Sequence, residues 1–282
     1  MRKIIDFLKQ IVPRSVWLFF RKGWYAVYDF VRGIGPRIMK RPYCGIKLYY
    51  NRGNNIIRRL KKEPIFEVEM CEAIGKELNK SDEPIFVDIG ANIGLISSYV
   101  IEKVPTLKKI YAFEPGPVQR EMLLLTVNEN GLSEKIEVSS CALGKEHGQT
   151  TFYSHDPKCV ANDGLIDTGR THDARPISVE VDTLDLWWER MGQPKVGVVK
   201  IDTEGAELWV LQGGAGFLKS CHPIIFLEIE PRNLRVYPYD HFDIMDFFAK
   251  AGYALYALGG ETVTRQNFDR LIAEGEDTYM AY

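Results

Sequence analysis

From residue 85 onward, short apolar segments alternate with longer amphipathic ones, and this pattern constrains the fold more than any other feature of the sequence. Apolar runs of strand length predict β-strands at 85–89, 109–113, 135–140, 196–201, 224–229, 253–258 and 278–282. Helical periodicity predicts α-helices at 93–104, 118–130, 182–191, 207–211 and 242–251. Alternation of this kind is typical of βαβ units, and parallel strands covered on both faces read as nearly continuous apolar runs. The sequence therefore predicts an α/β fold built around a mostly parallel sheet.

Charge is distributed unevenly along the chain. Residues 1–63 contain 16 Lys and Arg against 3 Asp and Glu, a net charge of +13, whereas the remainder holds 20 basic and 35 acidic residues, a net charge of −15. Such a split between segments indicates that they do different jobs. We therefore predict a basic, aromatic-rich helical N-terminal extension over residues 1–63 and a folded domain over residues 64–282. A short strand at 45–52 and a helix at 66–78 are expected near this boundary.

Aromatic and basic side chains are interleaved in the extension, for example at Trp17, Arg21 and Trp24. A helix of this kind can bind a membrane surface, where anionic lipids attract each nearby Lys or Arg by about 1 kcal/mol. Helical periodicity more often means that the aromatics pack on a core. Three roles therefore stay open for residues 1–62: binding an anionic membrane surface, packing on the domain, and mediating a homodimer.

Other sequence features favour a cytoplasmic protein, with peripheral attachment to the inner membrane surface if the extension binds lipid. The longest uncharged stretch, Ile89 to Ile101, is shorter than the roughly 18 apolar residues that a spanning helix needs. Asp6 and Lys9 interrupt any signal-peptide apolar region. The five cysteines are scattered, with no CxxC pair, which favours reduced thiols and no structural zinc.

The segment FVDIGANIG, residues 86–94, is the strongest local signal. An apolar strand ends at Asp88, a glycine-containing turn follows, and a helix begins near residue 93. Open α/β sheets bind ligands at the carboxyl ends of their strands, near the switch in strand order. We therefore expect Asp88, Gly90, Asn92 and Gly94 to line a nucleotide-type cleft.

Glu114 ends the next predicted strand, 20 residues after Gly94, where nucleotide-binding sheets place an acidic residue on the ribose hydroxyls. A dinucleotide fingerprint needs the pattern GxGxxG, but Asn92 and Leu95 occupy the places of its second and third glycines. This argues against an NAD-dependent oxidoreductase. It favours a nucleoside-type cofactor such as S-adenosyl-L-methionine.

The order of the motifs resembles that of the FkbM-type methyltransferases. The resemblance covers roughly residues 66–230 and is carried by VDIGANIG, AFEP, NENGL, CALG, VDTLD, VKIDTEGAELWVLQGG and PIIFLEIEP. It implies a Rossmann-like, seven-stranded, mostly parallel sheet of the class I methyltransferase type. It also implies S-adenosyl-L-methionine as cofactor and O-methylation of hydroxyls on sugars and natural products.

The resemblance carries cofactor-binding roles to individual residues. The motif that begins at Asp88 is expected to hold the methionine end of the cofactor, and Glu114 the ribose. Cys141, Ala142 and Leu143 stand where many methyltransferases place an acidic and a small residue beside the adenine. A cysteine accepts hydrogen bonds weakly, so the backbone or Leu143 must hold the ring.

The segment VVKIDTEGAE, residues 198–207, places Asp202 and Glu204 at the end of the fourth strand, over the transferable methyl group in this fold. An alcohol acceptor must lose a proton, and a nearby carboxylate can take it. Asp202 is the first candidate for this base and Glu204 the second. The alternative is that both carboxylates cap the following helix or bind the cofactor amine.

Lys200 lies within the same apolar strand, where it should be buried. A buried lysine needs a partner or a lowered pKa. We expect an ion pair with Glu228 or Glu230 on the neighbouring strand, and a catalytic lysine is the alternative.

Further polar groups surround this region. Five carboxylates that could converge as oxygen ligands of a divalent cation are Asp202, Glu204, Glu207, Glu228 and Glu230. Spacing alone does not show convergence, and we expect no metal. The connection from Leu143 to Lys195 is long enough to be functional, with a hairpin predicted between 150–153 and 177–181. His155 and His172 lie in this connection and could reach a substrate.

These observations predict an S-adenosyl-L-methionine-dependent O-methyltransferase that acts on a sugar, glycan or glycosylated small molecule. The alternatives are a methyltransferase-like scaffold docked through its basic arm and a nucleic-acid methyltransferase. The acidic domain lacks the basic footprint of nucleic-acid binding, so we expect no nucleic-acid partner.

Overall fold

A computed structural model describes residues 38–155, 163–170 and 174–282. Contacts divide the chain into two compact units, Met1–Met39 and Lys40–Tyr282, and the second contains nearly all described residues. Residues 1–37 of the predicted helical extension, together with Cys159 and His172, lie outside the described residues. The roles predicted for the extension therefore remain predictions.

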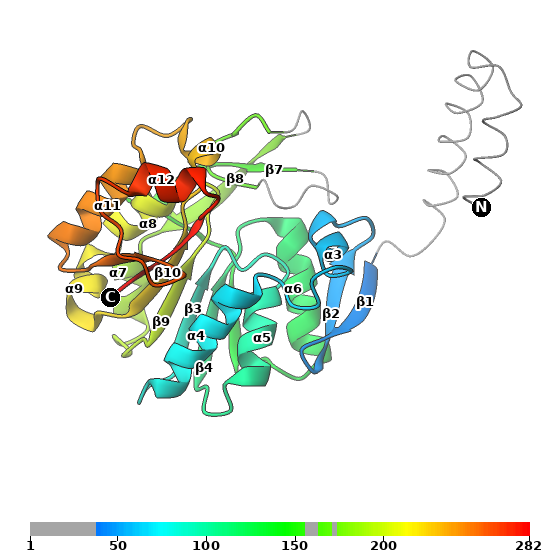
Figure 1. Cartoon of the computed structure of the whole chain (residues 1–282). Coiled ribbons are helices and arrows are strands. Elements are labelled where there is room, and N and C mark those ends of the chain that lie inside the picture. The colour runs from blue at the N-terminus through cyan, green and yellow to red at the C-terminus, as the bar shows by residue number, and fades with distance from the viewer. Residues whose placement is uncertain (1–37, 156–162, 171–173) are drawn as a thin grey trace, which may run out of the picture. The chain divides into compact units, whose positions relative to one another are not determined.

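A seven-stranded sheet forms the centre of the second unit, as the sequence predicts (Figure 1). Its strands, in spatial order, are β11 (Leu255–Ala257), β12 (Thr278–Ala281), β10 (Ile224–Glu228), β9 (Val198–Ile201), β3 (Ile85–Ile89), β4 (Lys109–Phe113) and β5 (Ile136–Ser139). The neighbours from β10 through β5 pair in parallel. β12 runs antiparallel to both β10 and β11, so the sheet is mostly parallel.

The strand order reverses direction at the middle of this sheet. From β3 the chain moves outward through β4 to β5, and it then returns to the other side of β3 to form β9 and β10. β3 and β9 are therefore the two sides of a topological switch point. Doubly wound sheets bind ligands outside the carboxyl ends of the strands at this point.

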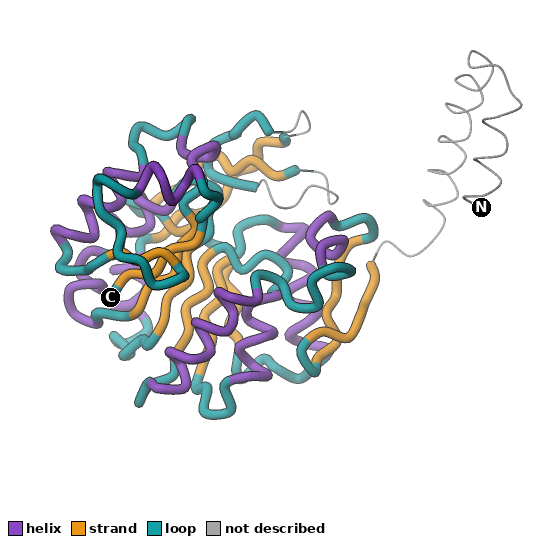
Figure 2. The backbone as a smooth tube through the Cα atoms, in the orientation of Figure 1, coloured by secondary structure: helices purple, strands orange, loops and turns teal. Residues whose placement is uncertain are grey.

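Helices cover both faces of the sheet (Figure 2). They are α4 (Val68–Lys80), α5 (Leu95–Lys103), α6 (Pro117–Glu129), α7 (Leu184–Arg190), α8 (Glu207–Gln212), α9 (Ala215–Cys221), α10 (Pro231–Leu234), α11 (His241–Lys250) and α12 (Phe268–Ala273). Alternate strand residues enter two hydrophobic cores: Phe86 packs with apolar residues of α4, α5 and α6. Val87 points to the opposite face and packs with those of α7, α8, α9, α11 and α12. This double burial explains why the strands read as continuous apolar runs.

A small hairpin precedes the main sheet and packs beside α6. It consists of β1 (Ile38–Tyr43) and β2 (Ile46–Asn51), and the short helix α3 (Asn55–Arg59) follows. Leu48 and Ile56 share a buried cluster with Met122, and the Tyr49 amide donates a hydrogen bond of 3.0 Å to Thr126 Oγ1. The strand predicted at 45–52 is thus confirmed. The domain division at residue 63 remains a prediction, and residues just before it pack on the main domain.

Between β5 and β9 the chain forms a second sheet of three strands. Its order is β6 (Ala142–Leu143), β8 (Arg175–Asp182) and β7 (Gly148–Ser154). β7 and β8 pair antiparallel, with Thr150 opposite Val179, which confirms the predicted hairpin. In Figure 1 this insertion stands near α10, which directly follows β10. We refer to residues 143–182 as the insertion.

Among the described helices, none has both the length and the apolar character to cross a membrane. The cysteines in the described part of the chain, Cys44, Cys71, Cys141 and Cys221, are all free thiols, as predicted for them.

Gly213, at the end of α8, packs closely against Gly144 of the insertion and supplies a test of this packing. A Cβ atom at Gly213 would overlap the carbonyl oxygen of Gly144. Because this oxygen belongs to the backbone, it cannot easily move away. We expect Gly213→Ala to lower the free energy of unfolding by at least about 2 kcal/mol, as overpacking does. The control Gly259→Ala, which would meet no atom within 4 Å, should stay within about 0.5 kcal/mol of the parent protein. Equal urea midpoints for the two variants would contradict this account.

Candidate functional site

A cleft of about 330 Å³ opens at the carboxyl ends of β3, β4, β9 and β10. Its lining includes nearly every residue that the sequence analysis assigned to a site: Asp88, Gly90, Asn92, Glu114, Cys141, Ala142, Leu143, Lys200, Asp202 and Glu204. Gly94 is outside the lining and instead caps α5 with a φ of 84°. The sequence therefore identifies the correct end of the sheet, and the individual roles remain predictions.

The turn between β3 and α5 is folded tightly against the neighbouring strands. Gly90 and Asn92 have φ values of 78° and 51°, in the left-handed region that favours glycine and tolerates asparagine. A Cβ atom at Gly90 would overlap the carbonyl oxygen of Asp202 at the end of β9. The amides of Gly90 and Ala91 both donate hydrogen bonds of 3.0 Å to the Phe113 carbonyl. The turn is thus fixed by both adjacent strands, and only glycine fits at its first position.

Glu114 is buried at the end of β4 and is held by the backbone. One carboxyl oxygen accepts a hydrogen bond of 2.7 Å from the Asn92 amide, and the other accepts one of 2.7 Å from the Gly116 amide. Burial raises the pKa of Glu114 to about 7, although these two amides oppose the shift. A carboxylate has about four acceptor positions, so two remain for a ligand in the cleft.

Lys200 forms a buried ion pair, but its predicted partners Glu228 and Glu230 are wrong. The strand register places Asp88 opposite Lys200 on one side and Phe226 on the other. The Lys200 Nζ atom lies 3.1 Å from Asp202 Oδ2 and 3.6 Å from Asp88 Oδ1. It also donates a hydrogen bond of 3.0 Å to the Gly90 carbonyl.

The electrostatics of Lys200 favour a structural role. Burial opposes its charge, but the carboxylates of Asp202 and Asp88 outweigh burial and hold its pKa above the usual value. Asp88 is fully buried, accepts a hydrogen bond of 2.6 Å from Ser97 Oγ and has a pKa raised by burial. A lysine that stays protonated cannot accept a proton from a substrate.

Three of the five carboxylates considered in the sequence analysis converge. One oxygen from each of Asp202, Glu204 and Glu228 lies within 4.8 Å of the others. Glu207 and Glu230 are engaged elsewhere. The expectation that the site holds no metal remains a prediction.

The three converging carboxyl groups differ in the direction of their pKa shifts. Burial would raise the pKa of Asp202, but Lys200 and a hydrogen bond from Glu228 lower it overall. Burial and the charge of Asp202 raise the pKa of Glu204 to about 8 and that of Glu228 well above its usual value. Asp202 is therefore the most readily ionised member of the group.

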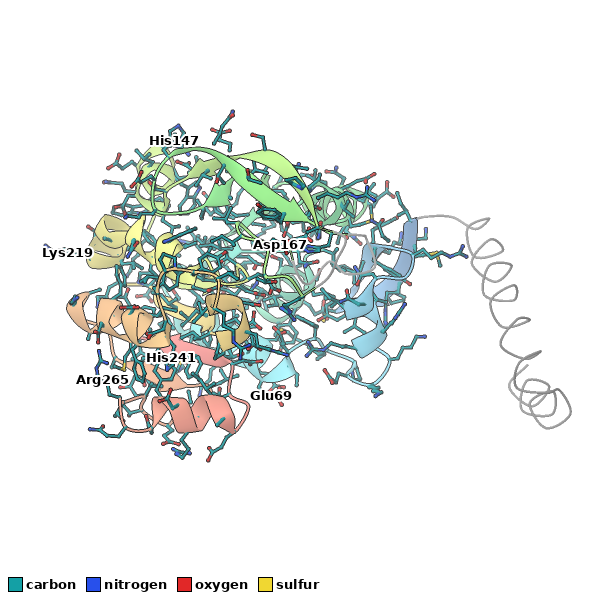
Figure 3. All side chains as sticks on the ribbon, turned by 90° about the horizontal axis from the view of Figure 1, so that it is seen from above. Glu69, His147, Asp167, Lys219, His241 and Arg265 are labelled. Carbon is teal, nitrogen blue, oxygen red and sulfur yellow. The ribbon has the colours of Figure 1, made fainter. Side chains whose placement is uncertain are left out.

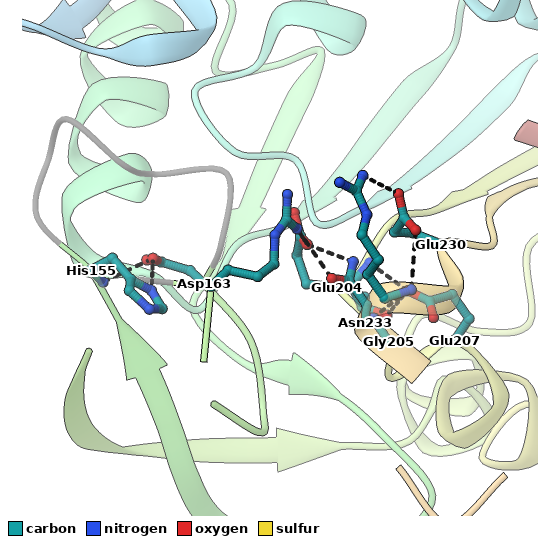
Figure 4. Close-up of polar contacts among 10 residues, drawn as sticks. His155, Asp163, Glu204, Gly205, Glu207, Glu230 and Asn233 are labelled. Atoms are coloured by element: carbon teal, nitrogen blue, oxygen red, sulfur yellow. Dashed lines mark hydrogen bonds and ion pairs between the residues drawn. The ribbon is translucent and has the colours of Figure 1, made fainter. Parts of the chain in front are cut away.

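Glu207 folds the turn that presents Asp202 and Glu204. Its Oε1 atom accepts hydrogen bonds from the Thr203 amide at 3.0 Å, the Thr203 hydroxyl at 2.9 Å and the Gly205 amide at 3.0 Å. Glu207 itself is buried at the start of α8. Figure 4 shows Glu207 beside Gly205. The turn also requires a φ of 56° at Glu204, an unusual value for a residue other than glycine.

Glu204 is held by two neighbours. Its Oε2 atom accepts hydrogen bonds of 2.9 Å from Arg170 Nη1 and 2.7 Å from Asn233 Nδ2 (Figure 4). Arg170 comes from the insertion and Asn233 from α10. The insertion is therefore attached to the main sheet directly over the ends of β9 and β10.

The insertion also reaches the other end of the cleft, beside Glu114. Asp163 lines the cleft and accepts a hydrogen bond of 2.7 Å from Gln119 Nε2. The His155 ring, fully buried, lies with Nδ1 at 3.1 Å from Asp163 Oδ1 (Figure 4). His155 thus supports Asp163 and is not part of the cleft lining, in contrast to the expectation that it reaches a substrate.

Apart from Leu143, sequence reasoning missed the cleft residues that the insertion supplies. They are Phe152, Asp163, Leu165 and Arg170. The only signal for them was the unusual length of the connection that contains them. Of the other histidines, His147 and His241 are paired with Asp182 and Asp269 and lie outside the cleft lining (Figure 3).

Comparison with known proteins agrees with this architecture. A family model described as the methyltransferase FkbM domain matches residues 88–255, which is more than half of the chain. The chain belongs to the FkbM methyltransferase domain family. The matched segment of this FkbM domain starts at Asp88 and includes the insertion, so it contains most of the cleft.

Three curated relatives show how far the similarity extends. Methyltransferase sdnD of Sordaria araneosa is 31% identical over 48% of this chain and 62% of its own length. 2-O-methyltransferase NoeI of Sinorhizobium fredii is 25% identical over 54% of this chain and 66% of its own. Hexuronic acid methyltransferase AglP of Haloferax volcanii is 27% identical over 51% of this chain and 55% of its own length. The FkbM domain described here thus matches less than two thirds of the length of each relative.

The raised pKa of Glu204 predicts a pH dependence of stability. Between its unfolded value near 4.5 and its folded value of about 8, the folded state binds more protons than the unfolded state. The free energy of unfolding should therefore fall as pH rises through this window, by up to about 1.4 kcal/mol per pH unit for one group. Glu67 and Glu114, whose pKa values are raised by burial to about 7, act in the same direction.

Urea unfolding between about pH 5 and pH 8 measures this effect. We expect Glu204→Gln to unfold with a shallower pH dependence than the parent protein, because the variant lacks the titrating group. The control Glu189→Gln removes an exposed carboxylate on α7 and should keep the parent slope. Identical slopes for all three proteins would contradict the assignment.

Proposed function

We propose that this protein transfers the methyl group of S-adenosyl-L-methionine to a hydroxyl of a sugar, glycan or glycosylated small molecule. The observation that carries the proposal is Glu114, a buried carboxylate held at the end of β4 by two backbone amides. It lies beside the glycine turn of β3 at the switch point of an FkbM domain. Two acceptor positions on a fixed carboxylate suit the two hydroxyls of a ribose.

The residues around the cleft fit this cofactor. The turn at Gly90 and Asn92 would hold the methionine end, because only a residue without a side chain fits at Gly90. Glu114 would bind the ribose. Apolar side chains of Leu143 and Phe152 would contact the adenine, and backbone groups near Cys141 would replace the missing acidic partner. The cofactor supplies an electrophilic methyl group on a positively charged sulfur.

The chain must then align the acceptor and take its proton. Asp202 is ionised and held by Lys200, so it can accept a hydroxyl proton at neutral pH. Glu204, with a pKa of about 8, is mostly protonated there and is tied to Arg170 and Asn233. We therefore assign the base to Asp202 and a positioning role to Glu204. Lys200 keeps Asp202 ionised and in place.

The relatives support a hydroxyl-bearing acceptor of the sugar class. One is named as a 2-O-methyltransferase and another as a hexuronic acid methyltransferase. Both names describe those proteins, and together they make hexoses and hexuronic acids the first acceptors to test.

Thermal unfolding in the presence of ligand tests the cofactor. S-adenosyl-L-methionine and S-adenosylhomocysteine at about 100 times the dissociation constant should each add about 2.7 kcal/mol of stability. For a domain of this size the melting temperature should rise by roughly 5–10 °C. Glu114→Ala should abolish the shift, Glu189→Gln should retain it, and NAD should produce none. A protein unaffected by either cofactor form would instead fit the scaffold alternative.

Replacement of the base separates chemistry from binding. We expect Asp202→Asn to lower kcat at least about 100-fold, because an amide cannot accept the hydroxyl proton. Cofactor binding, measured by calorimetry, should persist. Transfer of labelled methyl groups to hexose and hexuronic acid acceptors supplies the rate, with Glu189→Gln as the control. An Asp202→Asn enzyme with the parent kcat would exclude Asp202 as the base.

A further inference from the structure

The three converging carboxyl groups of the cleft differ in their partners. Asp202 has the ammonium group of Lys200 at 3.1 Å, and Glu204 has the guanidinium group of Arg170 at 2.9 Å. Glu228 forms no ion pair with a lysine, arginine or histidine among the described residues. In the described part of the chain, Glu228 is therefore the member of the group without a cation at ion-pair distance.

The sheet itself forces Glu228 towards Asp202. Leu227 of β10 pairs with Ile201 of β9, so Glu228 and Asp202 are the next residues on adjacent parallel strands. Their carboxyl oxygens lie within 4.8 Å, and the Glu228 carboxyl group donates a hydrogen bond to Asp202. Two carboxyl groups held this closely do not ionise independently, because each charge disfavours the other. This proximity favours a state in which the two carboxyl groups hold one proton between them.

The charged groups that line the cleft with this pair come from several elements. Those at the carboxyl ends of β9 and β10 and in their loops are Lys200, Glu204, Glu230 and Arg232, and those from other elements are Arg59, Glu67, Asp88, Glu114, Asp163, Arg170 and Asp277. Arg59, Arg170 and Arg232 each lie within 4.0 Å of a carboxyl oxygen, that of Glu67, Glu204 and Glu230, respectively. Lys200 lies at ion-pair distance from both Asp202 and Asp88. Among the described residues no cation lies at that distance from Glu228, and Arg232 attracts its charge only from farther away. A second full negative charge beside Asp202 is therefore weakly opposed until a positively charged ligand enters the cleft.

We propose that Glu228 is a further catalytic residue, which holds the proton shared with Asp202 and releases it when the sulfonium form of the cofactor binds. The inference rests on the proposed function, because that function supplies a fixed positive charge to this cleft. Release of the proton leaves two carboxylates side by side. The pair can then accept the proton of the acceptor hydroxyl.

The transfer step balances in atoms and charge. The acceptor oxygen forms a bond to the methyl carbon, the carbon–sulfur bond breaks, and its electron pair stays on sulfur as a neutral thioether. The hydroxyl proton passes to the Asp202–Glu228 pair. The positive charge on sulfur and one negative charge on the pair disappear together, so the net charge of the cleft does not change.

Calorimetry detects the proton directly and needs no acceptor or turnover. S-adenosyl-L-methionine is titrated into the protein at about pH 7 in phosphate and in Tris, whose ionisation enthalpies differ, with EDTA present. We expect about one proton to be released for each S-adenosyl-L-methionine bound and about none for S-adenosylhomocysteine, which lacks the charge. The dissociation constant of the methyl donor alone should fall with rising pH, by up to about tenfold per pH unit.

Two glutamine variants of the same cleft provide matched controls. Glu228→Gln should bind S-adenosyl-L-methionine without releasing a proton. Glu230→Gln should keep the release, because Arg232 lowers the pKa of Glu230 and keeps this glutamate ionised throughout. If Glu228→Gln does not fold, Asp202→Asn removes the other half of the pair and should also abolish the release.

The parent protein alone can decide the question. Binding of S-adenosyl-L-methionine with the same heat in both buffers would overturn the role of Glu228 while leaving the proposed function intact. Equal proton release by S-adenosylhomocysteine would also overturn it, because the release would then not depend on the sulfonium charge. Failure of both forms to bind would overturn the proposed function and this inference with it.

Discussion

The buried ammonium group of Lys200, at the centre of the sheet, connects the turn after β3 with the turn after β9. Lys200 contacts carboxylates on β3 and after β9, and it donates to the backbone carbonyl of Gly90. Removing one partner of such a buried group would leave an uncompensated charge, which typically costs about 3–5 kcal/mol. The turn assigned to the cofactor and the carboxylate assigned to proton transfer therefore share one cation. Neither can shift without disturbing the other.

The insertion completes the cleft that the strand ends begin. Arg170 binds Glu204 over β9, and Asp163 binds Gln119 of α6 beside Glu114. These two contacts attach one loop region to both sides of the switch point. The strand ends provide fixed carboxylates on rigid elements, and the insertion provides apolar and polar surface above them. A cofactor with an adenine and a charged end needs both kinds of surface.

The fold was predictable because apolar periodicity reports burial on both faces of each strand. The cleft was predictable because Asp88, Glu114 and Asp202 all stand where an apolar strand ends. The partner of Lys200 was not predictable, since sequence gives neither strand order nor register, and Asp88 and Phe226 occupy the places beside it. Phe152 and Asp163 were also beyond sequence reasoning. They lie on an inserted hairpin whose position above the sheet depends on tertiary contacts with Gln119 and Glu204.

The charge of the cleft limits which ligands the protein can accept. Nine Asp or Glu side chains line it against four Arg or Lys, so acidic groups outnumber basic ones where ligands would bind. A nucleic acid would bring many phosphates towards these carboxyl groups, which is the opposite of the basic footprint that such ligands require. A cofactor with a fixed positive charge gains from the same field. An acceptor that carries neutral hydroxyls is not repelled by this field. Arg59, Arg170 and Arg232 each already contact a glutamate of the cleft. A carboxylate on a sugar would have to displace one of these glutamates in order to bind an arginine.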